Sequence, residues 1–222
     1  MKILAINASP NREGSTAKLI GMLLEECGKS GAECELVHIE DYSVEPCRRC
    51  KKCIKGSLCG IDDDYLHLKA KMLESDGIII GSPYYDGKPV DGLKLFMERL
   101  NTSSVFCNLF AKKYLVGVAT SAVDDCRHIA EYCATLGNIA PLSGSIVSGI
   151  LCQCMVSSDG VRELQYDTEL KTRIQNLAKK LISDIESSYD ACNKRNKQKS
   201  GFSFLNSLRL IFSKLLRRNP AK

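Results

Sequence analysis

Tryptophan is absent from this sequence of 222 residues, and aromatic residues make up only 6% of it. Apolar residues account for 44%, so aliphatic side chains have to supply most of the core. No run approaches the roughly 20 apolar residues that a membrane-spanning helix needs. Met1 and Lys2 lead directly into Ile3–Ile6, without the basic start, long apolar run and cleavage site of a secretion signal. We therefore expect a soluble, cytoplasmic protein with one main domain.

Acidic residues are missing from one end of the chain. Between Asn193 and Lys222 there are nine Lys or Arg and no Asp or Glu, against 31 and 26 in the whole sequence. Residues 1–192 therefore hold 22 basic and 26 acidic side chains, a net charge of −4, although the whole chain carries +5. A mildly acidic body does not attract nucleic acid, so we expect no nucleic-acid partner.

Short aliphatic runs alternate with helical patterns along the chain. The runs have the length and β-branched content of buried parallel strands, and the patterns have the spacing of amphipathic helices. This alternation predicts an α/β fold, namely a flavodoxin-like doubly wound parallel sheet of five strands in the order 2-1-3-4-5. The predicted strands are Lys2–Ala8, Cys34–Ile39, Gly77–Gly81, Tyr114–Thr120 and Ile146–Leu151, and the predicted helices are Thr16–Cys27, Asp63–Glu74, Val90–Leu100, Asp124–Leu136 and Asp167–Ser187.

A change of composition near Ala191 divides the predicted protein into two parts. Residues 1–190 form the flavodoxin-like domain, with a cysteine-rich loop at 46–60 after the second strand, and residues 191–222 form a basic linker and tail. Within the tail, apolar and basic residues recur at helical spacing over 202–218. Such an amphipathic helix predicts either contact with an anionic membrane surface or a partner, or docking on the protein's own body or a neighbouring subunit.

The loop after the first predicted strand reads SPNREGST, from Ser9 to Thr16, and a helix follows at once. In an open sheet of this kind, ligands bind outside the carboxyl ends of the strands. Hydroxyls, backbone N–H groups and Arg12 suit a phosphate at the positive end of a helix dipole. The P-loop and the spaced glycines of a dinucleotide site are missing, so a single phosphate monoester, such as that of FMN, fits better. An ordinary turn with Ser15 as the N-cap is the alternative.

The loop after the third predicted strand reads GSPYYDGKP, from Gly81 to Pro89. Its prolines and glycines fix an irregular backbone, and Tyr84 and Tyr85 offer aromatic faces. A flat, electron-poor ring system needs N–H donors along one edge and apolar or aromatic walls, which such a loop can provide. The alternative is a rigid turn whose tyrosines cover the edge of the core.

The segments SPNREGST and GSPYYDGKPVDGLKLFMER resemble the FMN-binding segments of the NADPH-dependent FMN reductase and iron–sulfur flavoprotein group. The resemblance covers roughly Met1 to Leu100 and implies an FMN-dependent oxidoreductase that forms a homodimer or homotetramer. Relatives often have glycines after the fourth strand, whereas this chain has Thr120 and Ser121, which puts a role for either in doubt. By the resemblance, Ser9, Asn11, Arg12, Ser15 and Thr16 would hold the FMN phosphate, and Pro83, Tyr84, Tyr85 and Gly87 would lie along the isoalloxazine ring.

Four of the twelve cysteines, Cys47, Cys50, Cys53 and Cys59, occupy one loop with the spacing C-x2-C-x2-C-x5-C. The first three thiols are spaced so that they can surround one cubane iron–sulfur cluster, and the fourth thiol completes its set of ligands. Structural zinc usually takes two separated pairs. A thiol switch and buried free cysteines are further alternatives, although the interleaved Lys and Arg argue against burial. Because a compact cysteine run in this loop distinguishes iron–sulfur flavoproteins from plain FMN reductases, the resemblance implies that these four residues ligate a 4Fe–4S cluster.

Basic residues lie between these cysteines, and three aspartates follow them. The basic residues would partly neutralise an anionic cluster and favour its reduced form. We hypothesise that this basic rim also steers an acidic electron donor such as ferredoxin. Asp62–Asp64 suit the N-cap and the dipole of the next helix, with a metal site as the alternative. The basic rim consists of Arg48, Arg49, Lys51, Lys52 and Lys55.

These features together predict an electron-transfer flavoprotein. It would pass electrons between a ferredoxin-like one-electron donor and FMN through the 4Fe–4S cluster, and on to a quinone, oxygen or peroxide. One alternative is an NAD(P)H-dependent FMN or quinone reductase whose cysteine loop is structural or holds zinc, and another is a non-enzymatic redox sensor. No general acid or base is expected. The remaining cysteines, among them Cys152 and Cys154 on one predicted strand, are interpreted as core or surface thiols rather than a redox pair.

Overall fold

The computed structural model describes residues 1–55, 57–104, 110–122, 125–137, 145–157, 160–161, 164 and 167–196. Its centre is a five-stranded sheet in the order β2-β1-β3-β4-β5, with every neighbouring pair parallel. The predicted fold and strand order are therefore confirmed. The strands are β1 Lys2–Asn7, β2 Glu33–His38, β3 Gly77–Pro83, β4 Tyr114–Ser121 and β5 Ile146–Cys154.

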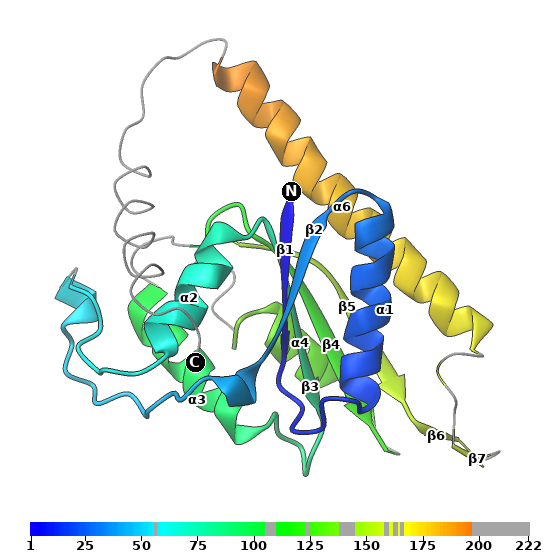
Figure 1. Cartoon of the computed structure of the whole chain (residues 1–222), viewed down its shortest axis with the longest axis horizontal. Coiled ribbons are helices and arrows are strands. Elements are labelled where there is room, and N and C mark those ends of the chain that lie inside the picture. Colours follow the sequence, from blue (N-terminus) through cyan, green and yellow to red (C-terminus); the bar gives the residue numbers. More distant parts are fainter. Residues whose placement is uncertain are drawn as a thin grey trace.

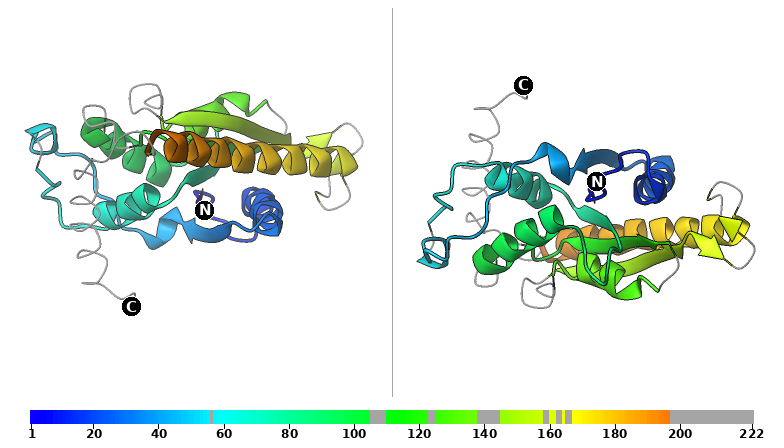
Figure 2. Two further views of the ribbon diagram at one scale, coloured as in Figure 1. Left: turned by 90° about the horizontal axis from the view of Figure 1, so that it is seen from above. Right: turned by 90° about the horizontal axis from the view of Figure 1, so that it is seen from below.

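Helices cover both faces of the sheet (Figures 1 and 2). The first and last described helices share one face, and the three between them share the other. Side chains alternate between the two cores along each strand: in β1, Leu4 and Ile6 face one core while Ile3 and Ala5 face the other. The helices are α1 Ser15–Lys29, α2 Tyr65–Glu74, α3 Asp91–Ser104, α4 Arg127–Ala134 and α6 Thr168–Asn196.

Gly117, in the middle of β4, allows α4 to approach the sheet closely. A Cβ atom on Gly117 would lie 1.8 Å from the carbonyl oxygen of Ala130 in α4, closer than any packing allows. The backbone of the strand and that of the helix therefore touch directly at this point. The contact fixes the height of α4, and with it the loop between β4 and α4, above the sheet.

Several boundaries differ from the predicted ones. The helix predicted from Asp63 starts at Tyr65, because the preceding aspartates bind another segment of the chain, as described below. The final helix continues past Ser187 to Asn196, so the first part of the predicted linker is helical. A short antiparallel pair, β6 Val156–Ser157 and β7 Gly160–Val161, was not expected from the sequence.

The predicted amphipathic tail at 202–218 lies outside the described residues, as does Asp124. Within the part of the chain that the structure describes, no helix is both long enough and apolar enough to cross a lipid bilayer. The loop at 46–60, drawn in cyan, stands out from one end of the molecule beside α2 and α3 (Figures 1 and 2). It contains a short 3-10 turn, η2 Cys53–Lys55, and it follows another, η1 Ile39–Asp41.

Candidate functional site

The loop between β1 and α1 is held by a ladder of side-chain-to-backbone hydrogen bonds. The N–H of Ser9 donates to Asn7 Oδ1 at 3.1 Å, and the N–H of Asn11 donates to Ser9 Oγ at 3.2 Å. The N–H of Glu13 then donates to Asn11 Oδ1 at 3.0 Å. These short-range turns hold the loop in one shape before any ligand arrives. Two of the predicted phosphate-binding residues, Ser9 and Asn11, are thus part of the loop's own support.

Asn7 supports this loop, although it was not among the site residues predicted from the sequence. Its side chain is fully buried at the carboxyl end of β1, and its Nδ2 lies 3.1 Å from Nδ1 of His38 at the end of β2. Since Oδ1 accepts from Ser9, the amide nitrogen faces His38 and donates to it. The available signal was a polar residue in the last but one position of the predicted buried strand Lys2–Ala8.

The start of α1 is free of side-chain capping. The helix begins at Ser15, with Gly14 at the N-cap, and no described side chain caps it. The alternative with Ser15 as the N-cap is therefore wrong. The first N–H groups of the helix have no intrahelical partner, so together with the helix dipole they suit an anion. Ser15 is half-buried at this end and Thr16 is buried.

Arg12 has a carboxylate partner in the structure. It forms an ion pair with Asp41, and both side chains are about half exposed. The hydrogen bond that Arg12 donates to Asp41 raises the pKa of Arg12 above its ordinary value. An exposed pair of this kind contributes little to stability, so the guanidinium can exchange Asp41 for a stronger anion at little cost.

Thr120 joins the loops after β1 and β3. Its Oγ1 lies 2.7 Å from Thr16 Oγ1, and both side chains are buried. Its backbone oxygen accepts a hydrogen bond of 2.8 Å from the N–H of Tyr84. This threonine stands where relatives often have glycine, a departure that puts its role in doubt at the level of sequence. In the structure it connects the first turn of α1 to the segment that carries Tyr84 and Tyr85.

The segment after β3 is a tight two-residue turn. Tyr85 and Lys88 exchange backbone hydrogen bonds of 3.2 and 3.0 Å, and the residues between them, Asp86 and Gly87, both have positive φ. An Asp-Gly pair in that conformation is typical of a type I′ turn. The N–H of Val90 donates to the buried Ser82 Oγ at 3.4 Å and closes the base of the segment.

The two predicted flavin-facing tyrosines differ in their surroundings. Tyr84 is half-buried and meets the ring of His128 edge to face, with the centroids 5.4 Å apart. Tyr85 is 55% exposed, which is unusual for a large aromatic residue and leaves its face open to a ligand. Pro83 is buried as the last residue of β3, and Gly87 is exposed in the turn. The structure therefore places these four residues in one segment at the carboxyl edge of the sheet, the lower edge in Figure 1.

The four cysteines of the loop at 46–60 are accessible to solvent to different degrees. Cys50 is exposed, whereas Cys47, Cys53 and Cys59 are half-buried. In the residues that the structure describes, they are not gathered into a set of three or more metal ligands. On either side of Cys50, Arg49 and Lys51 adopt positive φ, a conformation that costs a non-glycine residue about 1–3 kcal/mol. Strained backbone of this kind is concentrated at functional sites.

Aspartates close the base of this loop. Asp64 Oδ2 accepts a 2.8 Å hydrogen bond from the N–H of Ser43, and the N–H of Asp64 donates to the oxygen of Ser43 at 3.0 Å. Asp63 Oδ2 accepts from the N–H of Glu45 at 2.8 Å. The expected role at the start of α2 holds only for Asp63, whose Oδ1 accepts from the N–H of Tyr65 at 3.2 Å. Asp64 occupies the N-cap position, but its own side chain does not cap the helix and accepts from Ser43 instead.

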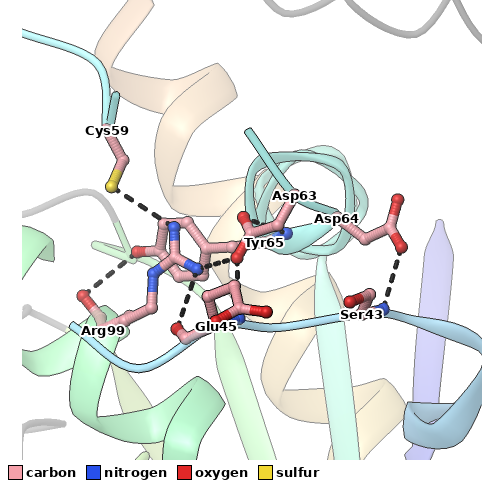
Figure 3. A network of polar contacts seen from close by, with 7 residues as sticks. All are labelled: Ser43, Glu45, Cys59, Asp63, Asp64, Tyr65 and Arg99. Carbon is pink, nitrogen blue, oxygen red and sulfur yellow. Dashed lines mark hydrogen bonds and ion pairs between the residues drawn. The ribbon is translucent and has the colours of Figure 1, made fainter. Parts of the chain in front are cut away.

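Arg99, from α3, contacts both ends of the loop (Figure 3). Its side chain is 2% exposed and forms an ion pair with Asp63, which is also 2% exposed. Nη1 donates to the oxygen of Glu45 at 3.2 Å, and Nη2 donates to Cys59 Sγ at 3.3 Å. The guanidinium lies 4.1 Å from the ring centre of Tyr65, whose hydroxyl donates to the oxygen of Arg99 at 3.1 Å.

The electrostatics of this network favour a charged guanidinium. Burial alone would lower the pKa of Arg99, but the hydrogen bonds to Asp63 and Cys59 outweigh it and raise the pKa above the ordinary value. Arg99 was not among the site residues predicted from the sequence. The available signal was its spacing, because it follows Phe96 by three residues and so shares the apolar face of the predicted helix.

The other described cysteines fit the interpretation as core or surface thiols. Cys27 and Cys133 are fully buried, and desolvation raises the pKa of both, to about 12 for Cys27. Such thiols stay protonated and unreactive. Cys152 is half-buried against the apolar core, and Cys154 Sγ donates to the oxygen of Ala122 at 3.2 Å.

Comparisons with known proteins agree on one group. The family model for NADPH-dependent FMN reductase matches residues 1–141. The chain is 30% identical over 197 residues to an iron–sulfur flavoprotein of Archaeoglobus fulgidus, covering 84% of this chain and 96% of that protein. It is 27% identical over 192 residues to an iron–sulfur flavoprotein of Clostridioides difficile, covering 84% and 80%. A solved flavone reductase, 16% identical with a TM-score of 0.63, covers 84% of this chain and 63% of its own, and shares the fold.

Proposed function

Because the chain belongs to the family of NADPH-dependent FMN reductases and iron–sulfur flavoproteins, and is an FMN-dependent oxidoreductase, we propose that it carries electrons between a one-electron donor and FMN through a 4Fe–4S cluster. The family inferred from the two loop segments is thereby confirmed. The observation that carries the proposal is the cysteine loop, whose two ends are closed by the aspartates and Arg99 beside Cys59.

The loop after β1 provides the proposed site for the FMN phosphate. The uncapped start of α1 supplies N–H donors, and Ser15 and Thr16 stand in its first turn. Ser9 and Asn11 hold the loop open around that point. Arg12 would exchange its exposed pair with Asp41 for the phosphate dianion, which is the stronger acceptor.

The segment after β3 provides the proposed site for the isoalloxazine ring. Pro83 restricts the backbone and Gly87 allows the positive φ of the turn, while Tyr84 and the exposed Tyr85 would supply aromatic faces to the ring. Thr120 keeps this segment in register with the phosphate loop, because it is bonded to both. The residues of this chain thereby bind and orient one flavin across two strand ends.

The donor set of the cysteine loop fits an iron–sulfur cluster. Four thiols from one short segment are soft ligands, which suit iron–sulfur centres or zinc rather than the oxygen-seeking Mg²⁺ or Ca²⁺. The guanidinium of Arg99 donates to Cys59 and has a further N–H, on Nε, for which the described residues supply no acceptor although the atom is buried. We propose that Cys47, Cys50, Cys53 and Cys59 are drawn together as the ligands, with the positive-φ residues Arg49 and Lys51 shaping an anion-binding concavity.

Together the two groups would let a one-electron donor serve a two-electron acceptor, since iron–sulfur clusters pass single electrons and FMN holds one or two. The protein's part is to bind them, shield them and set their potentials. We propose a ferredoxin-like donor at the basic rim, a quinone, oxygen or peroxide as acceptor, and a homodimer or homotetramer as the working assembly. NAD(P)H is the donor that the family name suggests as the alternative.

Anaerobic purification tests this proposal. We expect a brown protein that holds about one FMN and four iron and four sulfide ions per chain, with a cluster signal in EPR spectra after reduction. Cys50→Ser should lose most of the iron and keep the FMN, because Cys50 is exposed and its replacement does not disturb the core. Cys34→Ser, at a half-buried cysteine of β2 outside the loop, is the matched control and should keep both. Zinc in place of iron, or iron that survives in Cys50→Ser, would contradict the proposal.

A further inference from the structure

Among the residues that the structure describes, one ion pair has both side chains almost completely buried. Arg99 and Asp63 are each 2% exposed, whereas the pairs of Arg12 with Asp41 and of Arg127 with Glu131 are about half exposed or more. Removing two charges from water is costly, so a buried pair is weak evidence for stability by itself. Its position calls for another explanation, because it connects two segments that lie 36 residues apart in the sequence.

The pair is placed where the cysteine loop begins and ends. Arg99 donates to the oxygen of Glu45 before the first cysteine of the loop and to Sγ of Cys59, its last cysteine. Asp63 accepts a hydrogen bond from the N–H of Glu45, which completes the closure of the loop at its base. The face of Tyr65 fixes the plane of the guanidinium. Arg99 therefore has its position set by partners on three sides while one of its N–H groups points at a proposed cluster ligand.

Two of the groups that accept hydrogen bonds from Arg99, Asp63 and Cys59, can carry a negative charge. Asp63 pairs with the guanidinium, and Cys59 accepts one of its N–H groups. A cysteine that ligates a metal is a thiolate. With Cys59 ionised, one buried cation serves two anions. A hydrogen bond to a ligand sulfur and a nearby positive charge both stabilise the reduced, more negative state of a cluster.

We propose that Arg99 is a positioning residue for the cluster: it fixes Cys59 at the base of the loop, and its charge raises the cluster's reduction potential. Asp63 acts in the opposite sense, because it offsets that charge while it holds the loop closed. This inference rests on the proposed function, in which Cys59 is a cluster ligand. It adds a second, buried source of positive charge to the exposed basic rim.

Replacing each partner separately tests the proposal by the sign of its effect. The three variants are R99M, D63N and R99M/D63N, each made in the full-length protein and purified anaerobically. Redox titrations followed by EPR give the midpoint potential, and a chelator assay gives the rate of iron release. R99M should shift the potential to more negative values and D63N to more positive values, because they remove opposite charges. Both should release iron about 10–100-fold faster, as is typical when a group supporting a metal ligand is removed. FMN content should stay at the parent level.

A purely structural role would give a different pattern. Both single variants loosen the same closure of the cysteine loop. If they acted only through the order of the loop, both would shift the midpoint potential in the same direction. That outcome, or no shift in either variant, overturns the proposal. Should a single variant fail to fold, R99M/D63N decides, since it removes the two charges together. It should release iron faster than the parent, because Cys59 has lost its donor, and parent-like release overturns the proposal.

Two comparisons separate this inference from the proposed function. R127M removes an exposed arginine of α4 and should leave both the potential and the release rate unchanged, because solvent screens that charge. A parent protein without iron refutes the proposed function itself. An iron-loaded parent whose R99M and D63N variants keep its potential refutes the role of Arg99 alone.

Discussion

Thr120 shows at the scale of one residue how two loops become one site. Its hydroxyl and its backbone oxygen have separate partners, Thr16 in the loop after β1 and Tyr84 in the loop after β3. Neither contact depends on a long side chain, so a small β-branched residue at a strand end is sufficient. Because threonine and valine have nearly the same shape, the hydroxyl can be removed without creating a cavity.

The first residue-scale prediction concerns this hydroxyl. Thr120→Val leaves the buried Thr16 hydroxyl without its partner, and an unsatisfied buried group costs about 1–3 kcal/mol. We expect a loss of unfolding free energy of that order and a rise in the FMN dissociation constant on the order of tenfold, because the two loops are no longer held in register. Flavin fluorescence titration and urea denaturation measure the two quantities.

Thr172→Val provides the comparison, since the hydroxyl of Thr172 lies on the exposed side of α6 and bonds only within its helix. It should leave the FMN affinity unchanged. If Thr120→Val lowers the stability but binds FMN as tightly as the parent, then Thr120 supports the core and has no part in joining the loops.

Elements of the sheet were predictable because their signal is local. A run such as Gly77–Gly81 identifies β3 by its own composition, and the alternation of runs and helical patterns implies the strand order. The apolar run is shorter than the strand itself, because pairing with β4 continues through Ser82 and Pro83, which lie opposite Ala119 and Thr120. Backbone hydrogen bonds extend the ladder beyond the apolar side chains, and composition does not reveal them.

The candidate site was predictable only in part for a related reason. The cysteine spacing and the two loop segments are short motifs, so they can be read directly from the sequence. The closure of the cysteine loop is not a motif, because its contacts join residues 18 to 54 positions apart. Asn7 and Arg99 likewise have partners far away in the sequence, so their positions in a strand and on a helix face indicate burial but not which groups they contact.

The contact between β4 and α4 allows a prediction at the scale of elements. Gly117→Ala places a Cβ atom 1.8 Å from the oxygen of Ala130, so the helix has to move away from the sheet. We expect a loss of at least about 3 kcal/mol of unfolding free energy, at the upper end of what overpacking costs, or failure to fold. Urea denaturation with a far-UV circular dichroism signal measures it.

Gly21→Ala is the matched change in α1, where an added Cβ meets nothing within 4 Å. Because alanine has the higher helix propensity, this variant should be about 1 kcal/mol more stable than the parent. A Gly117→Ala protein of parent stability would show that α4 does not rest on β4 as closely as described.

Charge is distributed unevenly over the whole molecule. Residues 1–192 carry −4 in total, yet the loop at 46–60 holds five basic residues and no acidic one. All five are exposed, and the apolar side chains of Ile54 and Leu58, 44% and 46% exposed, stand among them. A basic rim around exposed apolar residues is complementary to an acidic protein surface.

The domain division at 190 and the role of the tail at 202–218 remain predictions.

The prediction at this scale reverses the sign of the rim. R48E/K51E changes the net charge of the loop from +5 to +1, since each substitution removes one positive and adds one negative charge. If an acidic ferredoxin docks here, its electrons should reach the protein about 10–100-fold more slowly at low ionic strength. The difference should shrink as salt is added, because the rim is exposed and a Debye length at 1 M salt is only about 3 Å. Stopped-flow reduction by ferredoxin at several salt concentrations measures both effects.

The control has to separate local steering from the net charge of the protein. K171E/K179E makes the same total change at two exposed positions of α6, a helix outside the cysteine loop. With docking at the rim, this variant should keep a reduction rate close to that of the parent, whereas an effect of overall charge would slow both variants equally. Dithionite, a small reductant that needs no protein docking surface, should reduce all three proteins at similar rates. Equal slowing of the two variants by ferredoxin, or no slowing of R48E/K51E, would place the donor elsewhere on the molecule.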